Sequence, residues 1–246
     1  IELSNPLFKQ YGNPFLLPTN THYLSFNTFK FVAKSNSSYG INLMGSKSKN
    51  AIVRQISFNK NGIRESRPIN VDGVKSLNVY MNYNKQYKLQ NDLKVSFRPT
   101  INSIFEHSFV SLNGEMGRVD FLRFRPSMNM GITYKEKIDM NLFYSLNASF
   151  SFYKQTNLFK NAQLITHNLE SEINVRYSRR FSSETKFIYT QNPQISKGLS
   201  KHAFLLNAGM SLHFLKEDKG QLKLYCYDLL NQGINIIRLT TGSYIS

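Results

Sequence analysis

The chain has 246 residues, of which 41% are hydrophobic, and it carries a formal net charge of +16. No stretch approaches the roughly 18 consecutive apolar residues that a membrane-spanning helix needs, which excludes that class of membrane protein. The single cysteine, Cys226, excludes an internal disulfide and a cysteine-based metal cluster, and it is expected to be a small apolar residue in a strand. The positive charge is compatible with nucleic-acid binding. The basic residues are not gathered on one helix or module, however, which favours solvated loops and turns or a basic pore lining.

Segments in which apolar and polar residues alternate recur along the chain, from near His22 through 77–83, 93–97, 140–153, 173–177, 204–214 and 222–226. Alternation at every second residue gives a strand one apolar and one polar face. We expect about ten such strands with no helix between them. This predicts an all-β, antiparallel sheet built from hairpins rather than a βαβ fold.

The segment Met140–Tyr153 is the longest of these and exceeds the roughly 9–11 residues with which a tilted strand crosses a bilayer. Asparagine and serine dominate its polar face. Its other face is a continuous apolar stripe of Met140, Leu142, Tyr144, Leu146, Ala148, Phe150 and Phe152. A strand with lipid on one side and water on the other has this pattern, so the sequence predicts a transmembrane β-barrel wall.

The predicted connections alternate in length. Short turns are expected near 34–38, 135–137, 178–183 and 216–220, with a longer version at 84–91, and long irregular connections near 46–61, 106–118, 155–161 and 191–201. Outer-membrane barrels have short turns on the inner rim and long loops outside. This arrangement places both chain ends on the outer side. Single-chain barrels, by contrast, normally keep both ends on the short-turn side. The sequence therefore favours a single barrel segment over residues 1–246 that lacks its closing strand.

Two stretches carry a family resemblance. Asn5-Pro6-Leu7 precedes Tyr11-Gly12-Asn13-Pro14-Phe15-Leu16-Leu17-Pro18, which resembles the Gly-Asn-Pro-x-Leu-x-Pro signature of TonB-dependent receptor barrels. The run from Leu222 to Gln232, followed by Ile236, Arg238 and Tyr244, resembles the penultimate strand and loop of the Bacteroidetes outer-membrane β-barrel family. The strands between these motifs have the length and spacing of that family, so the resemblance covers most of the chain.

The resemblance implies the C-terminal half of a barrel of about 22 strands, with a plug inside it, that takes up a bulky nutrient in the full-length parent. The implied partners are outer-membrane lipid, the N-terminal half and plug of the parent barrel, TonB acting through that part, and a surface lipoprotein. Nucleic acid is not expected as a partner. The resemblance also implies structural roles for the motif residues Gly12, Asn13, Pro14, Pro18, Asp228, Leu229, Leu230 and Asn231.

Physical chemistry supplies structural roles for several of these residues. Gly12 and Pro14 suit a turn, and Pro18 suits the extended start of a strand. Asp228 and Asn231 are expected to satisfy turn hydrogen bonds where a strand leaves the bilayer. Direct contact of these residues with a substrate is the alternative.

We find no catalytic or cofactor-binding motif. The five histidines lack metal-ligand spacing, and neither a nucleophile elbow nor a phosphate loop is present, so we expect neither an enzyme nor a bound metal or cofactor. Glu170 and Glu172 share a face as paired catalytic carboxylates would. Arg176 lies on that face too, which favours an ion ladder. A hydrogen bond inside the barrel is the expected role of His213.

The residues expected to face a ligand inside the barrel are Arg123, Arg125, Arg176 and His213. Arg123 and Arg125 alternate with Leu122 and Phe124, and together with Arg118 they could attract an anionic or polyhydroxylated ligand. The favoured alternative is that the arginines pair with Asp120 or with acids on the rest of the barrel.

Three functions remain open from the sequence. The first is a TonB-dependent receptor-type barrel, and the second is a non-transporting barrel that serves as an anchor, adhesin or partner-docking scaffold. The third is a soluble basic β protein that binds nucleic acid or glycan, which would fold without detergent or lipid.

Overall fold

The computed structural model describes residues 2–5, 8–154, 160–193, 200–215 and 219–232. The described strands form one 14-stranded sheet, and almost all of the strand pairs are antiparallel. A one-turn 3₁₀ helix, η1 (Ala33–Ser35), interrupts the strands. The expected all-β, antiparallel fold class is confirmed. Among the described residues, no helix has the length and apolar character needed to cross a membrane.

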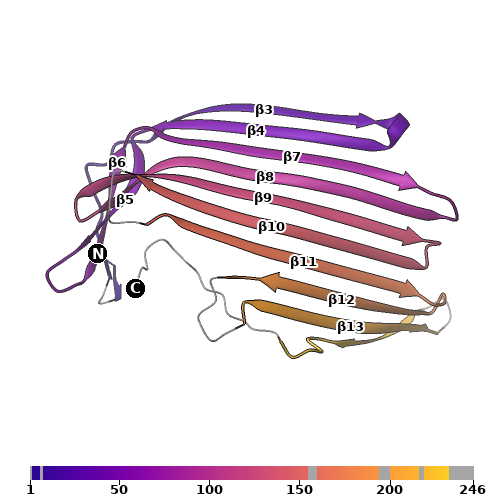
Figure 1. Cartoon of the computed structure of the whole chain (residues 1–246). Coiled ribbons are helices and arrows are strands. Elements are labelled where there is room, and N and C mark those ends of the chain that lie inside the picture. Colours follow the sequence, from indigo (N-terminus) through magenta and orange to yellow (C-terminus); the bar gives the residue numbers. More distant parts are fainter. Residues whose placement is uncertain (1, 6–7, 155–159, 194–199, 216–218, 233–246) are drawn as a thin grey trace.

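Ten of the strands form a single curved wall, each antiparallel to its neighbours (Figure 1). We call these strands the wall. In order across the sheet they are β3 (Asn20–Val32), β4 (Ser37–Lys49), β7 (Val74–Lys88), β8 (Leu93–Leu112), β9 (Glu115–Tyr134), β10 (Ile138–Lys154), β11 (Ala162–Arg176), β12 (Phe181–Gln191), β13 (His202–Phe214) and β14 (Gly220–Cys226). Met140–Tyr153, the strand singled out from the sequence, lies within β10.

Four shorter strands extend the sheet at the rim where β4 ends and β7 begins. β5 (Ala51–Phe58) and β6 (Arg64–Val71) form a hairpin, and β1 (Glu2–Asn5) and β2 (Phe8–Gln10) continue the sheet beyond it. β2 pairs with β6 in parallel, and β5 pairs in parallel with the end of β8. The irregular connection predicted over 46–61 is therefore wrong, because β4 continues to Lys49 and β5 follows one residue later.

The long connection predicted over 106–118 is also wrong. β8 and β9 are 20 residues each and are joined only by Asn113 and Gly114, whose φ angles are +51° and +88°. Asparagine and glycine tolerate positive φ, and Asn-Gly is the preferred pair of a tight hairpin turn. The short turns expected near 34–38, 135–137 and 178–183 are confirmed by the strand ends. The longer turn expected over 84–91 is shorter than predicted, because β7 continues to Lys88 and β8 begins at Leu93. The predictions for 155–161, 191–201 and 216–220 lie largely outside the described residues.

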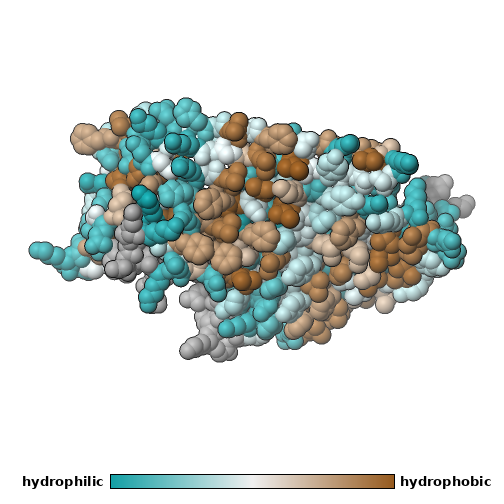
Figure 2. Space-filling view, turned by 45° about the horizontal axis from the view of Figure 1, so that its top comes forward, coloured by the Kyte–Doolittle hydropathy of each residue, from teal (hydrophilic) through white to brown (hydrophobic). Residues whose placement is uncertain are grey.

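Strand pairing aligns the alternating residues of neighbouring strands into two continuous faces. Met140 of β10 faces Ile132 of β9 and Ile173 of β11, whereas Asn141 faces Gly131 and Glu172. We call these the apolar face and the polar face of the wall. Figure 2 shows hydrophobic side chains gathered in a broad area across the strands, with hydrophilic ones gathered near the end that carries β5 and β6.

The wall has almost no buried hydrophobic core among the described residues. Among the described residues the buried hydrophobic side chains are Ala51 and Ala148, while large apolar side chains stay exposed, such as Leu24 at 80% and Leu224 at 67%. Soluble monomers rarely leave an apolar patch of more than a few hundred Å² open to water. An apolar environment outside the chain must therefore cover the apolar face, and a lipid bilayer supplies one.

Candidate functional site

A row of hydrogen-bonding side chains crosses the middle of the polar face. Register places each directly opposite the next on the neighbouring strand of the wall, from β3 to β11. We call this row the polar belt, and its members are Asn27, Asn42, Tyr80, Asn102, Arg125, Asn147 and Thr166. Amides, a phenol and a hydroxyl both donate and accept hydrogen bonds, and a guanidinium donates them, so the belt offers a surface suited to a polar ligand.

Two arginines concentrate positive charge at the centre of this belt. Arg125 Nε donates a hydrogen bond to Oδ1 of Asn147 at 3.0 Å. Arg123 lies two residues away on the same face, with its guanidinium 5.0 Å from the centre of the Phe121 ring. Its Nε is buried and has no hydrogen-bond partner among the described residues. The pair therefore keeps unused donors on the polar face, which is the property that an anion-binding or hydroxyl-binding site requires.

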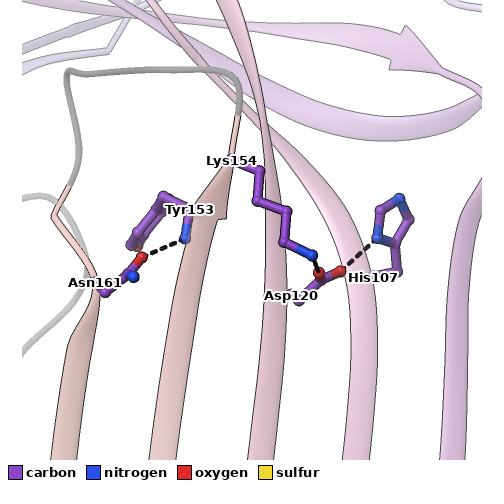
Figure 3. A network of polar contacts seen from close by, with 5 residues as sticks. All are labelled: His107, Asp120, Tyr153, Lys154 and Asn161. Atoms are coloured by element: carbon purple, nitrogen blue, oxygen red, sulfur yellow. Dashed lines mark hydrogen bonds and ion pairs between the residues drawn. The ribbon is translucent and has the colours of Figure 1, made fainter.

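The structure corrects two expectations about this pair. Asp120 and Arg118 lie on the apolar face, because their positions in β9 differ from those of Arg123 and Arg125 by odd numbers of residues and successive side chains point to opposite faces. Asp120 instead contacts His107 Nδ1 at 2.6 Å and Lys154 Nζ at 3.0 Å (Figure 3). The predicted pairing of the arginines with Asp120 is wrong, and Arg118 does not belong to their site.

The cluster of His107, Asp120 and Lys154 lies at the rim, beyond the apolar residues Leu122–Ile132 of β9 and outside the membrane-spanning part of that strand. The hydrogen bond with His107, followed by the one from Lys154, holds the pKa of the Asp120 carboxyl below its ordinary value. Asp120 therefore stays ionised at neutral pH and offsets part of the basic charge around it.

Ion pairs join neighbouring strands on the polar face toward the short turns. Lys186 Nζ lies 3.2 Å from Glu170, and Lys223 Nζ lies 2.6 Å from Glu184. Arg176 lies 3.7 Å from Asp139 and also donates to the backbone oxygen of Glu136. An ion ladder is therefore present, but its pairs differ from those expected, because Arg176 pairs with Asp139 rather than with Glu170 or Glu172. Because the six side chains are between 31% and 61% exposed, each pair contributes little to stability.

A polar hollow that the sequence reasoning missed lies beside this ladder. It has a volume of about 240 Å³, and Lys94, Arg98, Asp139, Asn141 and Asn174 are among its lining residues. The predicted alternation ended at Phe97, one residue short of Arg98. Extending the pattern by one position would have placed Arg98 on the polar face with Lys94 and Ser96.

A family model decides the identity of the chain. The model of the outer membrane protein β-barrel family matches residues 1–246. The chain belongs to this family. It is therefore a protein of the bacterial outer membrane, whose apolar face meets lipid and whose polar face lines the barrel interior. Comparisons with curated proteins and with solved structures found no match.

The predicted interior residues of this outer-membrane barrel protein do not converge on one point. Arg123 and Arg125 share the centre of the polar face on β9, whereas Arg176 lies at the end of β11. His213 lies on β13, half-buried on the polar face opposite Gln221 of β14. Of the four predicted residues, Arg123 and Arg125 are the two that lie close together. Among the described residues, no group of three or more His, Cys, Asp or Glu side chains could hold a metal ion.

Residues of the first family motif form hydrogen bonds with β6 just before β3 begins. Asn13 Nδ2 donates to the backbone oxygen of Pro68 at 3.0 Å, and its Oδ1 accepts from the backbone nitrogen of Phe15. Asn70 accepts a hydrogen bond from the backbone nitrogen of Leu17 and donates to the backbone oxygen of the same residue. Gly12 has open space around it, Pro14 lies in a turn, and Pro18 precedes the start of β3.

The second motif forms a turn after β14. The backbone nitrogen of Asp228 donates to Oδ1 of Asn207, and that of Leu229 donates to the backbone oxygen of Leu206. Asp228 and Asn231 have φ angles of +48° and +50°, and the backbone nitrogen of Asn231 donates to the oxygen of Asp228. Leu229 and Leu230 are exposed. The described residues of the motif thus anchor the chain to β13.

Proposed function

We propose that this chain is the C-terminal part of a Bacteroidetes barrel of the TonB-dependent receptor type, which takes up a bulky nutrient in the full-length parent. The observation that carries the proposal is the polar belt, with Arg125 in it and Arg123 beside it, on the interior face of a wall whose edge strands are open among the described residues. Among the described residues, β3 pairs only with β4, and β14 pairs only with β13. Further strands must cover these backbone edges in a membrane, because lipid cannot hydrogen-bond to them.

The chemistry of the belt favours an anionic or polyhydroxylated nutrient. Arg123 and Arg125 offer charged donors, and the amides of Asn102 and Asn147 flank Arg125 on both sides along the row. Such groups recognise carboxylates, phosphates and sugar hydroxyls, and they contribute most where water is excluded. The proposal includes no catalytic step, no cofactor and no nucleic-acid partner. The plug and TonB would act through the remainder of the parent barrel.

We expect the double variant Arg123→Gln/Arg125→Gln of the full-length parent to take up its nutrient about tenfold more slowly at low concentration, because two charge-assisted donors are lost. Removal of the plug or of the TonB-contacting region should abolish energised uptake. The measurement is the initial rate of uptake of labelled nutrient into cells that display equal amounts of each variant.

The matched control is Arg118→Gln, which removes one positive charge from the same strand but on the apolar face. Its uptake should equal that of the wild type. Unchanged uptake in the Arg123→Gln/Arg125→Gln variant would overturn the assignment of the site. Unchanged uptake after both deletions would overturn energised transport.

A second candidate function is a scaffold that anchors loops for adhesion or docking of a partner. The observation in its favour is the extension formed by β5, β6 and β2, which continues the sheet beyond the rim of the wall (Figure 1). A parent gene that encodes no plug would favour this function over uptake.

A further inference from the structure

A row of basic side chains crosses four strands of the lipid-facing side near the rim that carries β5 and β6. His22 of β3 faces Lys47 of β4, Lys47 faces Lys75 of β7, and Lys75 faces His107 of β8. The neighbouring row, two residues deeper into the membrane on each strand, consists of Leu24, Gly45, Leu77 and Phe105. Positive charge therefore begins where the apolar band ends.

Gly45 leaves a groove in this surface. The groove has a volume of about 480 Å³, with Leu24, Leu77 and Phe105 along its apolar part and His22, Lys47 and Lys75 along its basic part. A Cβ atom at Gly45 would meet nothing nearer than the backbone oxygen of Ser76 at 4.0 Å. The space above Gly45 is thus open, although the strands on both sides carry large side chains.

The two lysines lack a counter-charge. Lys47 and Lys75 are exposed and directly opposite each other, and within the described residues neither forms an ion pair. Like charges directly opposite on neighbouring strands, with Cβ atoms about 4.5–5.5 Å apart, destabilise a sheet. The acid next along the row, Asp120, already pairs with His107 and Lys154. Asp72 at the rim accepts a hydrogen bond from the backbone nitrogen of Asn50. An external anion would remove the repulsion between the lysines.

We propose that this groove binds a phosphorylated glycolipid of the outer leaflet. Its phosphate accepts hydrogen bonds from the Lys47 and Lys75 ammonium groups, and one acyl chain lies along Leu24, Leu77 and Phe105 above Gly45. Ammonium groups bind phosphate as point charges, and basic side chains just outside the apolar band attract anionic lipid headgroups. The elaborated rim with β5 and β6 corresponds to the outer side of a barrel of this class, which places the groove in the outer leaflet.

The test measures binding of bisphosphorylated lipid A to the full-length parent in detergent by native mass spectrometry. We expect Lys47→Gln/Lys75→Gln to weaken binding by roughly thirtyfold. For lipid A without phosphates, the same variant should have the affinity of the wild type. Gly45→Leu keeps both lysines but fills the groove, and it should weaken binding of both lipids by about tenfold or more.

The matched control is Lys30→Gln/Lys85→Gln, which removes two lysines from the lipid-facing side of β3 and β7 near the opposite rim. It should leave lipid A binding unchanged. Equal affinities of the two double variants would overturn the site, and unchanged binding by Gly45→Leu would overturn the acyl groove. Phosphatidylglycerol binding as tightly as lipid A would overturn the choice of a glycolipid. Nutrient uptake does not enter this test, so its outcome is separate from that of the proposed transport.

Discussion

Replacement of Leu146 by arginine is expected to destabilise the protein in lipid by about 2–4 kcal/mol, the cost of an arginine on the lipid face at the bilayer midplane. Leu146 lies at the centre of the apolar residues Met140–Phe152 of β10, and it faces His167 of β11 on the apolar face. The guanidinium would lie in hydrocarbon at this depth, too far from either surface to reach water without bending or thinning the bilayer.

The matched control is Ser145→Arg, one residue earlier on the same strand. Ser145 lies on the polar face between Ser127 and Asn168, so its arginine would extend into the barrel interior and should cost less than about 1 kcal/mol. Asn147 is a poorer control, because it accepts the hydrogen bond of Arg125. Reversible urea unfolding from lipid vesicles gives both free energies of unfolding. Equal costs at the two positions would mean that the faces of β10 are wrongly assigned.

Replacement of Gly209 by valine is expected to destabilise the protein by about 1–3 kcal/mol, the usual cost of forcing extra volume into a packed site. Gly209 is buried on the polar face of β13 and faces Tyr225 of β14. A Cβ atom there would lie 3.0 Å from Oε1 of Glu184, the oxygen that pairs with Lys223, and would overlap the Tyr225 ring. The variant should therefore loosen β14, which has a neighbour on one side only among the described residues.

Gly45→Val is the matched control for this variant, because a Cβ atom at Gly45 meets only the Ser76 oxygen at 4.0 Å. Valine favours strands at both positions, so the difference between the variants reports the space around each glycine rather than strand propensity. The same unfolding measurement applies, combined with the hydrogen-exchange rates of β14. A Gly209→Val variant as stable as Gly45→Val would show that Tyr225 does not pack over β13.

The alternation of apolar and polar residues was sufficient to predict the fold class, the approximate number of wall strands and the two faces. It succeeded because a membrane wall one sheet thick gives every strand a lipid side and a water side. No packed protein core also determines which positions are apolar. The same alternation would have separated Asp120 from Arg123, had it been continued toward the rim. The loop predicted over 106–118 interrupts this alternation, whereas these residues, apart from the Asn113-Gly114 turn, belong to β8 and β9.

Features that depend on contact between strands could not be predicted from the sequence. Strand register places Lys47 opposite Lys75, and it places Gly45 between Leu24 and Leu77. The register depends on pairing between residues that are far apart in the chain. The hairpin of β5 and β6 is likewise held by pairing with β2 and β8. The Asn113-Gly114 turn did carry a local signal, and a search for Asn-Gly pairs would have located it.

The central claim is that the wall separates lipid from water. Nitroxide labels placed one at a time at residues 141–151 of β10, in a Cys226→Ser background in lipid vesicles, test it most directly. Collision with oxygen, which concentrates in lipid, should peak at even-numbered positions such as Leu142 and Leu146. Collision with a water-soluble nickel complex should peak at odd-numbered positions such as Asn141 and Ser145. Accessibilities without a two-residue period, or with the two faces reversed, would contradict the membrane wall.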